Sequence, residues 1–178
     1  RFGYLLTEIA QRVGGDVVTL DTEWGTVFET DRICDAIREH RPRVVAMVHG
    51  DTSTTMAQPL EGISAVCQEA DALLYVDTTA TLCGMPIPVD DLQLDAVSTG
   101  LQKCMSGPPG TSPITINERA AAVVNNRKHI EGGIRPDDFV AGEGPVIISN
   151  YLDLGMLMDY WSPKRLNHHT ESTSMLYA

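Results

Sequence analysis

The sequence predicts an α/β domain in which a mainly parallel sheet lies between helices. Helical and strand-like patterns alternate along the chain, and this order is typical of layered α/β folds. Two candidate strands, residues 43–48 and 72–76, carry apolar side chains in continuous runs. Such runs are typical of strands buried on both faces, as in parallel sheets. With 178 residues, 43% of them hydrophobic, the chain can bury a core of its own.

The individual elements follow from spacing and from turn residues. Apolar side chains recur at helical spacing over residues 2–13, and Gly14 then provides a stop. Pro59 is placed to open a helix between the two buried strands, which makes one βαβ unit. The other candidates are strands at 16–20, 95–98 and 113–116, helices at 30–40, 118–128 and 151–160, and a Gly- and Pro-rich loop at 132–144.

The composition excludes several classes of partner. The formal net charge is −11 and the isoelectric point is near 4.7, so we expect no basic surface for nucleic acid or for an anionic membrane. No apolar run reaches the roughly 18 residues of a membrane span. Cysteines occur without a Cys-x-x-Cys pair, at Cys34, Cys67, Cys83 and Cys104. We therefore expect neither a zinc site nor a disulfide framework, and a reducing, cytoplasmic location.

Polar side chains gather directly after three of the predicted strands. They occupy residues 49–55, residues 77–81 and residues 98–103. In a parallel sheet the carboxyl ends of the strands lie at one edge, and ligands bind outside that edge. A carboxylate, a lysine and several hydroxyls should therefore converge on one cleft.

These side chains match the needs of one cofactor, pyridoxal 5'-phosphate (PLP). PLP needs an amine that forms an imine, an acid beside its pyridine nitrogen, and donors for a dianionic phosphate. Lys103 can supply the amine and Asp77 the acid. The hydroxyls and backbone amides around Gln102 can supply part of the phosphate site.

Each assignment has a simpler alternative. An aspartate after a strand is usually a cap or turn residue, and a lysine in a loop is usually solvated. The Cys-Met-Ser-Gly-Pro-Pro-Gly-Thr run after Lys103 favours function, because its prolines and glycines fix one backbone path. A Rossmann nucleotide site is not expected, since Gly-x-Gly-x-x-Gly is absent. A catalytically silent α/β binding module stays open, although Lys103 and Asp77 count against it.

Three motifs together resemble the class V aminotransferases. They are Val-Asp-Thr-Thr-Ala at 76–80, Ser-Thr-Gly-Leu-Gln-Lys at 98–103 and Gly-Pro-Pro-Gly-Thr at 107–111. The resemblance is to the alanine–glyoxylate and serine–glyoxylate branch, and it spans essentially the whole chain. It implies a PLP fold type I large domain of the aspartate-aminotransferase kind over residues 1–178.

The resemblance also implies a role for each matching residue. Lys103 is the lysine that forms the Schiff base with PLP, and Asp77 pairs with the pyridine nitrogen. Gln102 reaches the phosphate, while Thr52 contacts the ring side of the cofactor and Thr79 packs under the ring. Cysteine desulfurases of the same class carry histidine immediately before the lysine, so Gln102 counts against them.

The segment 165–177 resembles the part of these enzymes that crosses the dimer interface. By this resemblance Thr170 serves the phosphate site of the neighbouring subunit, so a homodimer with shared active sites is expected. His168 and His169 raise the alternative of a metal site. Because no acidic or cysteine companions stand at ligand spacing, we interpret both as structural or interface residues.

Asn167 indicates a subfamily. In alanine–glyoxylate enzymes a tyrosine usually precedes the two histidines, whereas Asn-His-His-Thr-Glu resembles the ureidoglycine–glyoxylate aminotransferases of purine breakdown. There the asparagine recognises the ureido group of the substrate. A substituted interface residue would give the same pattern, so alanine or serine stays open as the amino donor.

The expected reaction is the transfer of an amino group from (S)-ureidoglycine to glyoxylate, which gives glycine. Compared with the family, the chain is expected to lack an N-terminal portion with a glycine-rich phosphate turn and the aromatic residue that stacks on the ring. It is also expected to lack the small domain with the arginine for the substrate carboxylate. We therefore do not expect 178 residues to be active alone.

Overall fold

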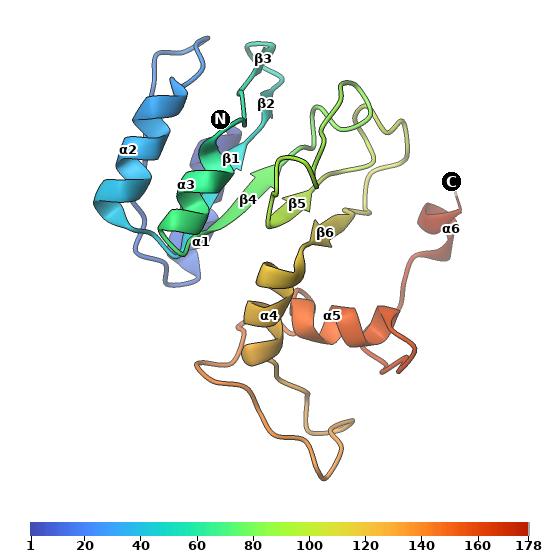
Figure 1. Ribbon diagram of the computed structural model, residues 1–178. Coiled ribbons are helices and arrows are strands. Elements are labelled where there is room, and N and C mark those ends of the chain that lie inside the picture. Colours follow the sequence, from blue (N-terminus) through green and yellow to red (C-terminus); the bar gives the residue numbers. More distant parts are fainter. Residues whose placement is uncertain (178) are drawn as a thin grey trace.

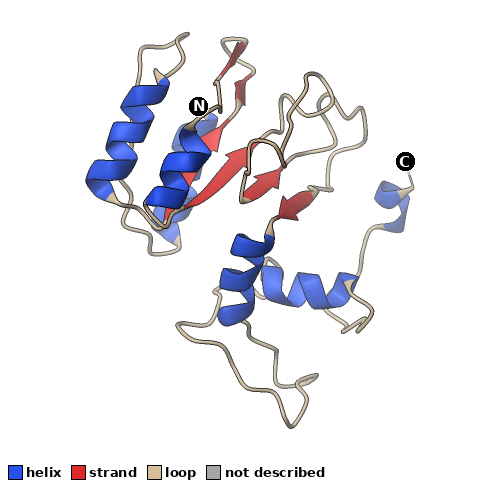
Figure 2. Ribbon diagram, in the orientation of Figure 1, coloured by secondary structure: helices blue, strands red, loops and turns tan. Residues whose placement is uncertain are grey.

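The computed structural model describes residues 1–177 and has the expected α/β architecture (Figure 2). Its strands are β1 (Val44–Val48), β2 (Gly50–Asp51), β3 (Met56–Ala57), β4 (Leu73–Asp77), β5 (Ala96–Ser98) and β6 (Ile114–Ile116). Its helices are α1 (Phe2–Arg12), α2 (Thr30–His40), α3 (Ile63–Glu69), α4 (Glu118–Asn126), α5 (Leu154–Trp161) and α6 (Thr173–Leu176). No helix of the described chain is long and apolar enough to cross a membrane.

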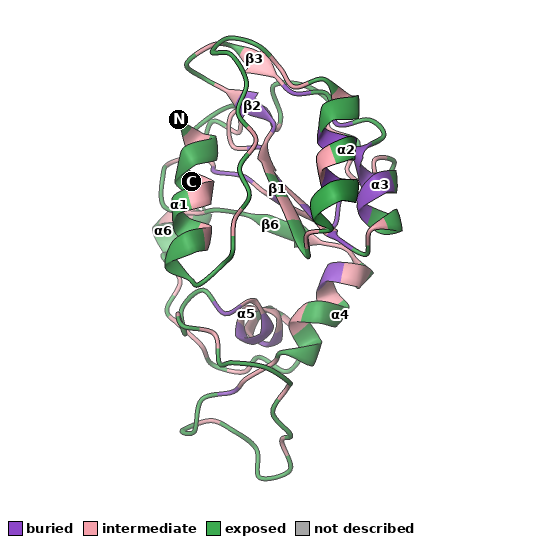
Figure 3. Cartoon of the chain, turned by 90° about the vertical axis from the view of Figure 1, so that its left-hand side faces the viewer, coloured by how far each residue is buried: buried purple, intermediate pink, exposed green. Residues whose placement is uncertain are grey.

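The main sheet has the strand order β1-β4-β5-β6. β1, β4 and β5 run parallel, and only β6 is antiparallel to its neighbour. The predicted βαβ unit is present as β1, α3 and β4 (Figure 1). Figure 3 shows α2 and α3 on one side of β1 and α1 on the other. The prediction of a mainly parallel sheet between helices is therefore confirmed.

The core lies between the sheet and the pair α2 and α3. On β4, Leu74 and Val76 are fully buried, whereas the alternate residues Leu73, Tyr75 and Asp77 are only half-buried. Each fully buried aliphatic side chain of this kind contributes roughly 1.5–3 kcal/mol. The helices and β5 complete the core with Ile33, Cys34, Ile37, Ile63, Val66, Cys67, Leu94 and Val97.

Burial on both faces of the strands was a wrong prediction. β1 has no fully buried residue, and Val44 is 55% exposed. The reason is the thin cover on the second face, where α1 contacts β1 but buries none of its own residues. Helix α1 is amphipathic as predicted, yet its apolar stripe stays partly exposed to solvent within the described chain.

Two further predictions need correction. Residues 16–20 are not a strand, because no neighbouring strand lies beside them to share hydrogen bonds, and Val18 is 59% exposed. Pro59 does not open α3. The helix begins only at Ile63, because Gly62 adopts a left-handed conformation with φ 80° directly before it. Leu60 is buried, as predicted, but it precedes the helix.

The N-terminal ends of β4 and β5 are held together by the buried carboxylate of Asp95. Asp95 is fully buried, and its Oδ2 accepts a hydrogen bond from the Leu74 amide at 2.7 Å. Its Oδ1 accepts from Asn117 Nδ2 at 2.8 Å and from Arg119 Nη1 at 2.9 Å. Arg119 also donates to the Ala72 carbonyl at 3.1 Å. This network ties β4 and β5 to the start of α4.

Helices α4 and α5 pack together below the sheet (Figure 1). Lys128, just after α4, pairs with Asp159 of α5 at 2.6 Å, and Lys164 approaches the same carboxylate at 3.3 Å. Burial alone raises the pKa of Asp159, but the two ammonium groups outweigh it and the pKa is lowered. The polar segment 132–144 between these helices contains no helix or strand, as predicted.

Candidate active site

The predicted convergence of polar residues occurs at the carboxyl ends of β1, β4 and β5. Val48 stands opposite Asp77, and Asp77 stands opposite Ser98 in the strand register. The turns that follow are joined as well. The His49 amide donates to the Asp77 carbonyl at 2.9 Å, and the Thr78 amide donates to the Ser98 carbonyl at 2.8 Å. The parallel sheet therefore brings the start of all three clusters to one edge.

Asp77 is the last residue of β4, and its carboxylate is only partly used by the protein. Oδ1 accepts hydrogen bonds from the Thr79 amide at 2.9 Å and from the Thr79 hydroxyl at 2.5 Å. Oδ2 has no hydrogen-bond donor within residues 1–177. Thr79 thus fixes the carboxylate and leaves one anionic oxygen for a ligand.

Tyr75 lies two residues before Asp77, on the same face of β4. Its hydroxyl is 2.7 Å from Ser98 Oγ. Burial raises the pKa of Tyr75; the hydrogen bond to Ser98 opposes this effect, and the charge of Asp77 adds to it. The phenol of Tyr75 therefore stays protonated beside the Asp77 carboxylate.

Lys103 lies in the loop that follows β5, with its side chain exposed. The loop closes on itself, because the Gly107 amide donates to the Leu101 carbonyl at 2.9 Å and the Ser106 amide donates to the Lys103 carbonyl at 2.9 Å. The Lys103 amine has no hydrogen-bond partner or ion pair within the described part of the chain. The backbone is thus fixed around a free amine.

The lysine loop is also packed against the turn that follows Asp77. The Cys104 thiol donates to the Ala80 carbonyl at 3.4 Å. A Cβ at Gly84 would lie 2.7 Å from Cys104 Sγ, so only glycine allows this close approach. The loop that contains Lys103 is therefore in direct contact with the turn that follows Asp77.

His49 supports the same turn from β1. Its Nδ1 is 2.8 Å from the Thr81 hydroxyl, and both side chains are buried. Burial lowers the pKa of His49, against the smaller opposing effect of Glu61. A Cβ at Gly50 would lie only 2.3 Å from Thr81 Cγ2. His49 was within a predicted cluster, but its part in holding the Asp77 turn was missed.

Thr52 and Gln102 lie in loops beside this edge. Thr52 is exposed in the turn between β2 and β3, a small antiparallel hairpin that the sequence did not predict. Asp51 closes that turn, since its carboxylate accepts from the Ser53 amide at 3.1 Å and from the Thr54 hydroxyl at 3.1 Å. The Ser53 hydrogen bond is the largest cause of the lowered pKa of Asp51. The Thr52 side chain is therefore exposed to solvent.

Asn167 and Thr170 are not brought to Asp77 within one chain. Both are exposed on the segment between α5 and α6, which Figure 1 shows apart from the loops after β4 and β5. No hydrogen bond joins either of them to Asp77 or Lys103 in residues 1–177. Their expected service to a neighbouring subunit stays a prediction.

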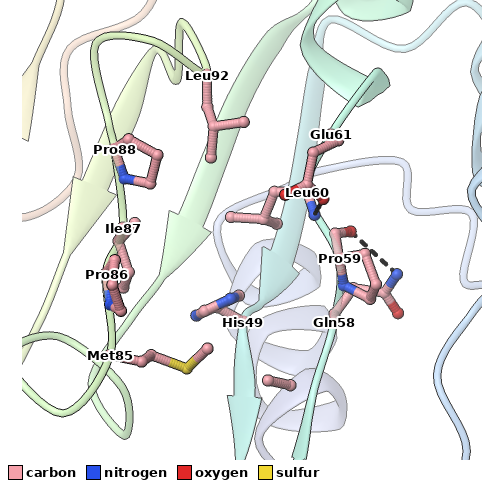
Figure 4. A pocket seen from close by; sticks show the side chains of 11 residues that line it. His49, Gln58, Pro59, Leu60, Glu61, Met85, Pro86, Ile87, Pro88 and Leu92 are labelled. Atoms are coloured by element: carbon pink, nitrogen blue, oxygen red, sulfur yellow. Dashed lines mark hydrogen bonds between the residues drawn. The ribbon is translucent and has the colours of Figure 1, made fainter.

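A groove of about 270 Å³ lies next to the candidate site, but it is not the site itself. Figure 4 shows His49 between two walls of this groove. Asp77 and Lys103 do not line it. The walls are formed by Ala57, Gln58, Pro59, Leu60 and Glu61 and by Met85, Pro86, Ile87, Pro88 and Leu92. The candidate site is therefore an open edge of the sheet rather than an enclosed cavity.

Comparisons with known proteins indicate one family. The family model "Aminotransferase class-V" matches residues 4–135. A curated relative, the (S)-ureidoglycine–glyoxylate transaminase of Bacillus subtilis, is 51% identical over 180 residues, which cover 100% of this chain and 43% of that protein.

Solved structures give the same result. The crystal structure of ureidoglycine–glyoxylate aminotransferase from Bacillus subtilis has a TM-score of 0.87 at 50% identity and covers 99% of this chain and 42% of its own. An alanine–glyoxylate aminotransferase from Nostoc sp. has a TM-score of 0.86 at 35% identity, covering 99% of this chain and 43% of its own. The chain thus spans about two fifths of the length of these relatives.

Proposed function

Because the chain belongs to the class V aminotransferases, we propose that it is the cofactor-binding part of a transaminase that moves the amino group of (S)-ureidoglycine to glyoxylate. Glyoxylate becomes glycine, and the reaction serves purine and ureide catabolism. The observation that carries this proposal is Asn167 in the sequence Asn-His-His-Thr-Glu, within a chain 51% identical to a ureidoglycine–glyoxylate transaminase.

PLP is the cofactor of this family, and the residues at the sheet edge fit it. Asp77 Oδ2 and the Lys103 amine are without partners in the described chain. The Thr99 hydroxyl, four residues before the lysine, is buried and also has no partner in residues 1–177. Unsatisfied buried polar groups are rare in native proteins. An acceptor, an amine and a hydroxyl are the groups that the ring nitrogen, the aldehyde and the phosphate of PLP require.

Bound PLP supplies a carbonyl carbon for an amine and a ring that withdraws electrons. Lys103 Nζ would hold the cofactor and, once an incoming amine frees it, would take a proton from the substrate carbon. Asp77 Oδ2 would accept a hydrogen bond from the ring nitrogen, and its negative charge would retain the proton there. Thr79 keeps the carboxylate in orientation through its two hydrogen bonds.

The remaining assignments complete this proposal. Thr52 contacts the ring side, Thr79 packs under the ring, and Gln102 binds the phosphate. Thr170 of one subunit reaches the phosphate site of the other, in a cytoplasmic homodimer with two shared sites. The exposure of Thr170 and its separation from Asp77 within one chain support this arrangement.

The experiment that tests the donor is the substitution Asn167→Tyr in the full-length protein. The side-chain amide of Asn167 can donate to a carbonyl and accept from an amine, which matches a ureido group. Loss of such a site penalises the polar substrate strongly, so kcat/KM for (S)-ureidoglycine should fall by about 100-fold or more relative to kcat/KM for alanine. Asn125→Tyr, at an exposed position of α4, is the matched control. An equal loss for both donors would contradict the proposal.

A second candidate is an alanine–glyoxylate or serine–glyoxylate aminotransferase. The solved alanine–glyoxylate enzyme shares the fold over nearly the whole chain. The sheet, the loop that contains Lys103 and the turn after Asp77 are therefore compatible with either amino donor. The donor ratio of the unsubstituted full-length protein distinguishes the two, since the second candidate requires the higher kcat/KM for alanine or serine.

A further inference from the structure

The two histidines between Asn167 and Thr170 form a continuous line of hydrogen bonds. His168 Nε2 lies 2.6 Å from the Asn150 carbonyl oxygen, and His168 Nδ1 lies 2.7 Å from His169 Nδ1. His169 Nε2 lies 2.6 Å from Glu171 Oε1. Four groups from two segments of the chain are thus joined end to end.

The number of protons in this line can be counted. The Asn150 carbonyl only accepts, so His168 Nε2 carries a proton, and the Glu171 carboxylate only accepts, so His169 Nε2 carries another. The bond between the two Nδ1 atoms needs a third. Two neutral imidazoles bring two protons in total. The line therefore holds one proton more than two neutral rings and an ionised carboxylate would.

The surroundings suit this additional positive charge. Tyr160 of α5 lies over the His169 ring with the centroids 4.8 Å apart, and Tyr151 meets the edge of that ring at 5.2 Å. Tyr151 also stacks on His168 at 6.4 Å. Aromatic faces attract cations, and this attraction opposes the cost of a charge on the His169 side chain, which is only 9% exposed.

Within residues 1–177, the titratable groups in contact with the pair are a carboxylate and two phenols. Glu171 receives the hydrogen bond from His169, and Tyr151 and Tyr160 contribute the rings. Behind Asn150, its side-chain amide donates to Glu131 at 3.3 Å.

We propose that His168, His169 and Glu171 form a unit that shares one proton and positions Asn167 and Thr170 for the neighbouring active site. This rests on the proposed function, in which those two residues act across the dimer. Both histidines are turned inward and part-buried, whereas Asn167 and Thr170 on either side are exposed. The shared proton fixes the inward side, so the outward side chains are presented in one orientation.

The pH dependence follows directly. Without the additional proton, two bare Nδ1 atoms face each other and cannot form a hydrogen bond. Asn167 and Thr170 then lose their fixed orientation. His168, His169 and Glu171 are positioning residues, so KM for the amino donor should rise with pH while kcat changes little.

The direct test is nuclear magnetic resonance of the full-length protein labelled with ¹⁵N-histidine, without substrate. The expected result is protonated Nε2 on both rings, and a single titration step that His168 and His169 report together. Assignment comes from the variants His168→Gln and His169→Gln, with His40→Gln at the exposed end of α2 as control. Two neutral rings that titrate independently would overturn the inference.

Two further measurements separate positioning from simple stability. Hydrogen exchange of residues 166–172 should be faster in His169→Gln and unchanged in His40→Gln, because glutamine can bond but cannot hold the proton. KM for the donor should rise about tenfold, the value of one lost hydrogen bond, and its pH dependence should disappear. An unchanged exchange rate with a retained pH profile would refute positioning.

The outcomes of this proposal and of the proposed function are distinct. If the two rings share a proton but Asn167→Tyr affects both donors equally, the proton-sharing unit is supported and the ureidoglycine assignment is refuted. If the rings titrate separately but Asn167→Tyr selectively affects (S)-ureidoglycine, the proton-sharing unit is refuted and the proposed function is supported.

Discussion

Two aspartates at opposite ends of the neighbouring strands β4 and β5 should have opposite mutational effects. Asp95 lies where β5 begins and has both oxygens committed to donors of the protein, namely Leu74, Asn117 and Arg119. Asp77 lies where β4 ends and is bound only by Thr79 in the described chain. We predict that Asp95→Asn reduces stability with little effect on the chemistry, and that Asp77→Asn does the reverse.

The magnitudes follow from these contacts. An amide at position 95 must turn its NH2 group toward another donor, and it also removes the charge that faces Arg119. Breaking a buried ion pair costs about 3–5 kcal/mol. The Arg119 side chain is 35% exposed, so water partly replaces the lost partner and about 3 kcal/mol is expected.

At position 77 the amide oxygen can still accept both hydrogen bonds from Thr79, so the loss of stability should stay below about 1 kcal/mol. The neutral amide cannot retain the proton on the ring nitrogen, and turnover should fall on the order of 100-fold or more. Asp77→Glu should be intermediate, because it keeps the charge but shifts the oxygens.

The assay combines urea unfolding, followed by circular dichroism, with kcat/KM at saturating PLP, all on the full-length protein. Asp91→Asn, at an exposed position before β5, is the control for both measurements. The reasoning is refuted if Asp95→Asn unfolds at the wild-type midpoint, or if Asp77→Asn turns over within a few-fold of wild type.

Three other predictions concern separate parts of the molecule. Lys103→Ala should abolish transamination without moving the unfolding midpoint, because its side chain is exposed and unbonded in residues 1–177; turnover close to wild type would contradict this. Lys128→Met should cost about 2 kcal/mol at neutral pH. Since the folded pKa of Asp159 is lowered, this stabilisation is present above the ordinary value of 3.8 and is lost as the pH falls through the folded pKa, so urea midpoints of variant and wild type should converge in acid. Dilution should reduce activity if sites are shared, and a monomeric mass by light scattering in a fully active sample would exclude the homodimer.

The fold was largely predictable because its elements carry strong local patterns. The predicted helix over 30–40 coincides with α2, and the strands at 43–48 and 72–76 coincide with β1 and β4 within one residue. The rule that parallel strands end at one edge then placed Asp77 beside Ser98 without further information.

The failures have physical causes that local patterns do not contain. Residues 16–20 have strand-like side chains, but a strand exists only where a partner shares its hydrogen bonds. The hairpin of β2 and β3 has two residues in each strand, which is too short for any periodicity. The hydrogen bond between His49 and Thr81 joins residues 32 positions apart, so no local sequence pattern predicts it.

The two ends of the parallel strands differ: polar groups at one end are fully hydrogen-bonded within the protein, and polar groups at the other end are not. At the edge where β5 begins, all the hydrogen bonds of Asp95 are made within the protein. At the opposite edge, Asp77 Oδ2, Lys103 Nζ and Thr99 Oγ1 have no partner in residues 1–177, although all three lie on segments that are held firmly by other bonds. Selection for stability alone would satisfy or remove the buried Thr99 hydroxyl, because an unsatisfied buried group costs about 1–3 kcal/mol. Polar groups that are rigidly held yet unbonded are therefore expected at a ligand site, where sequences depart from local consistency. Their clustering on the loops that follow β4 and β5 supports the carboxyl edge as the place of the chemistry independently of any resemblance.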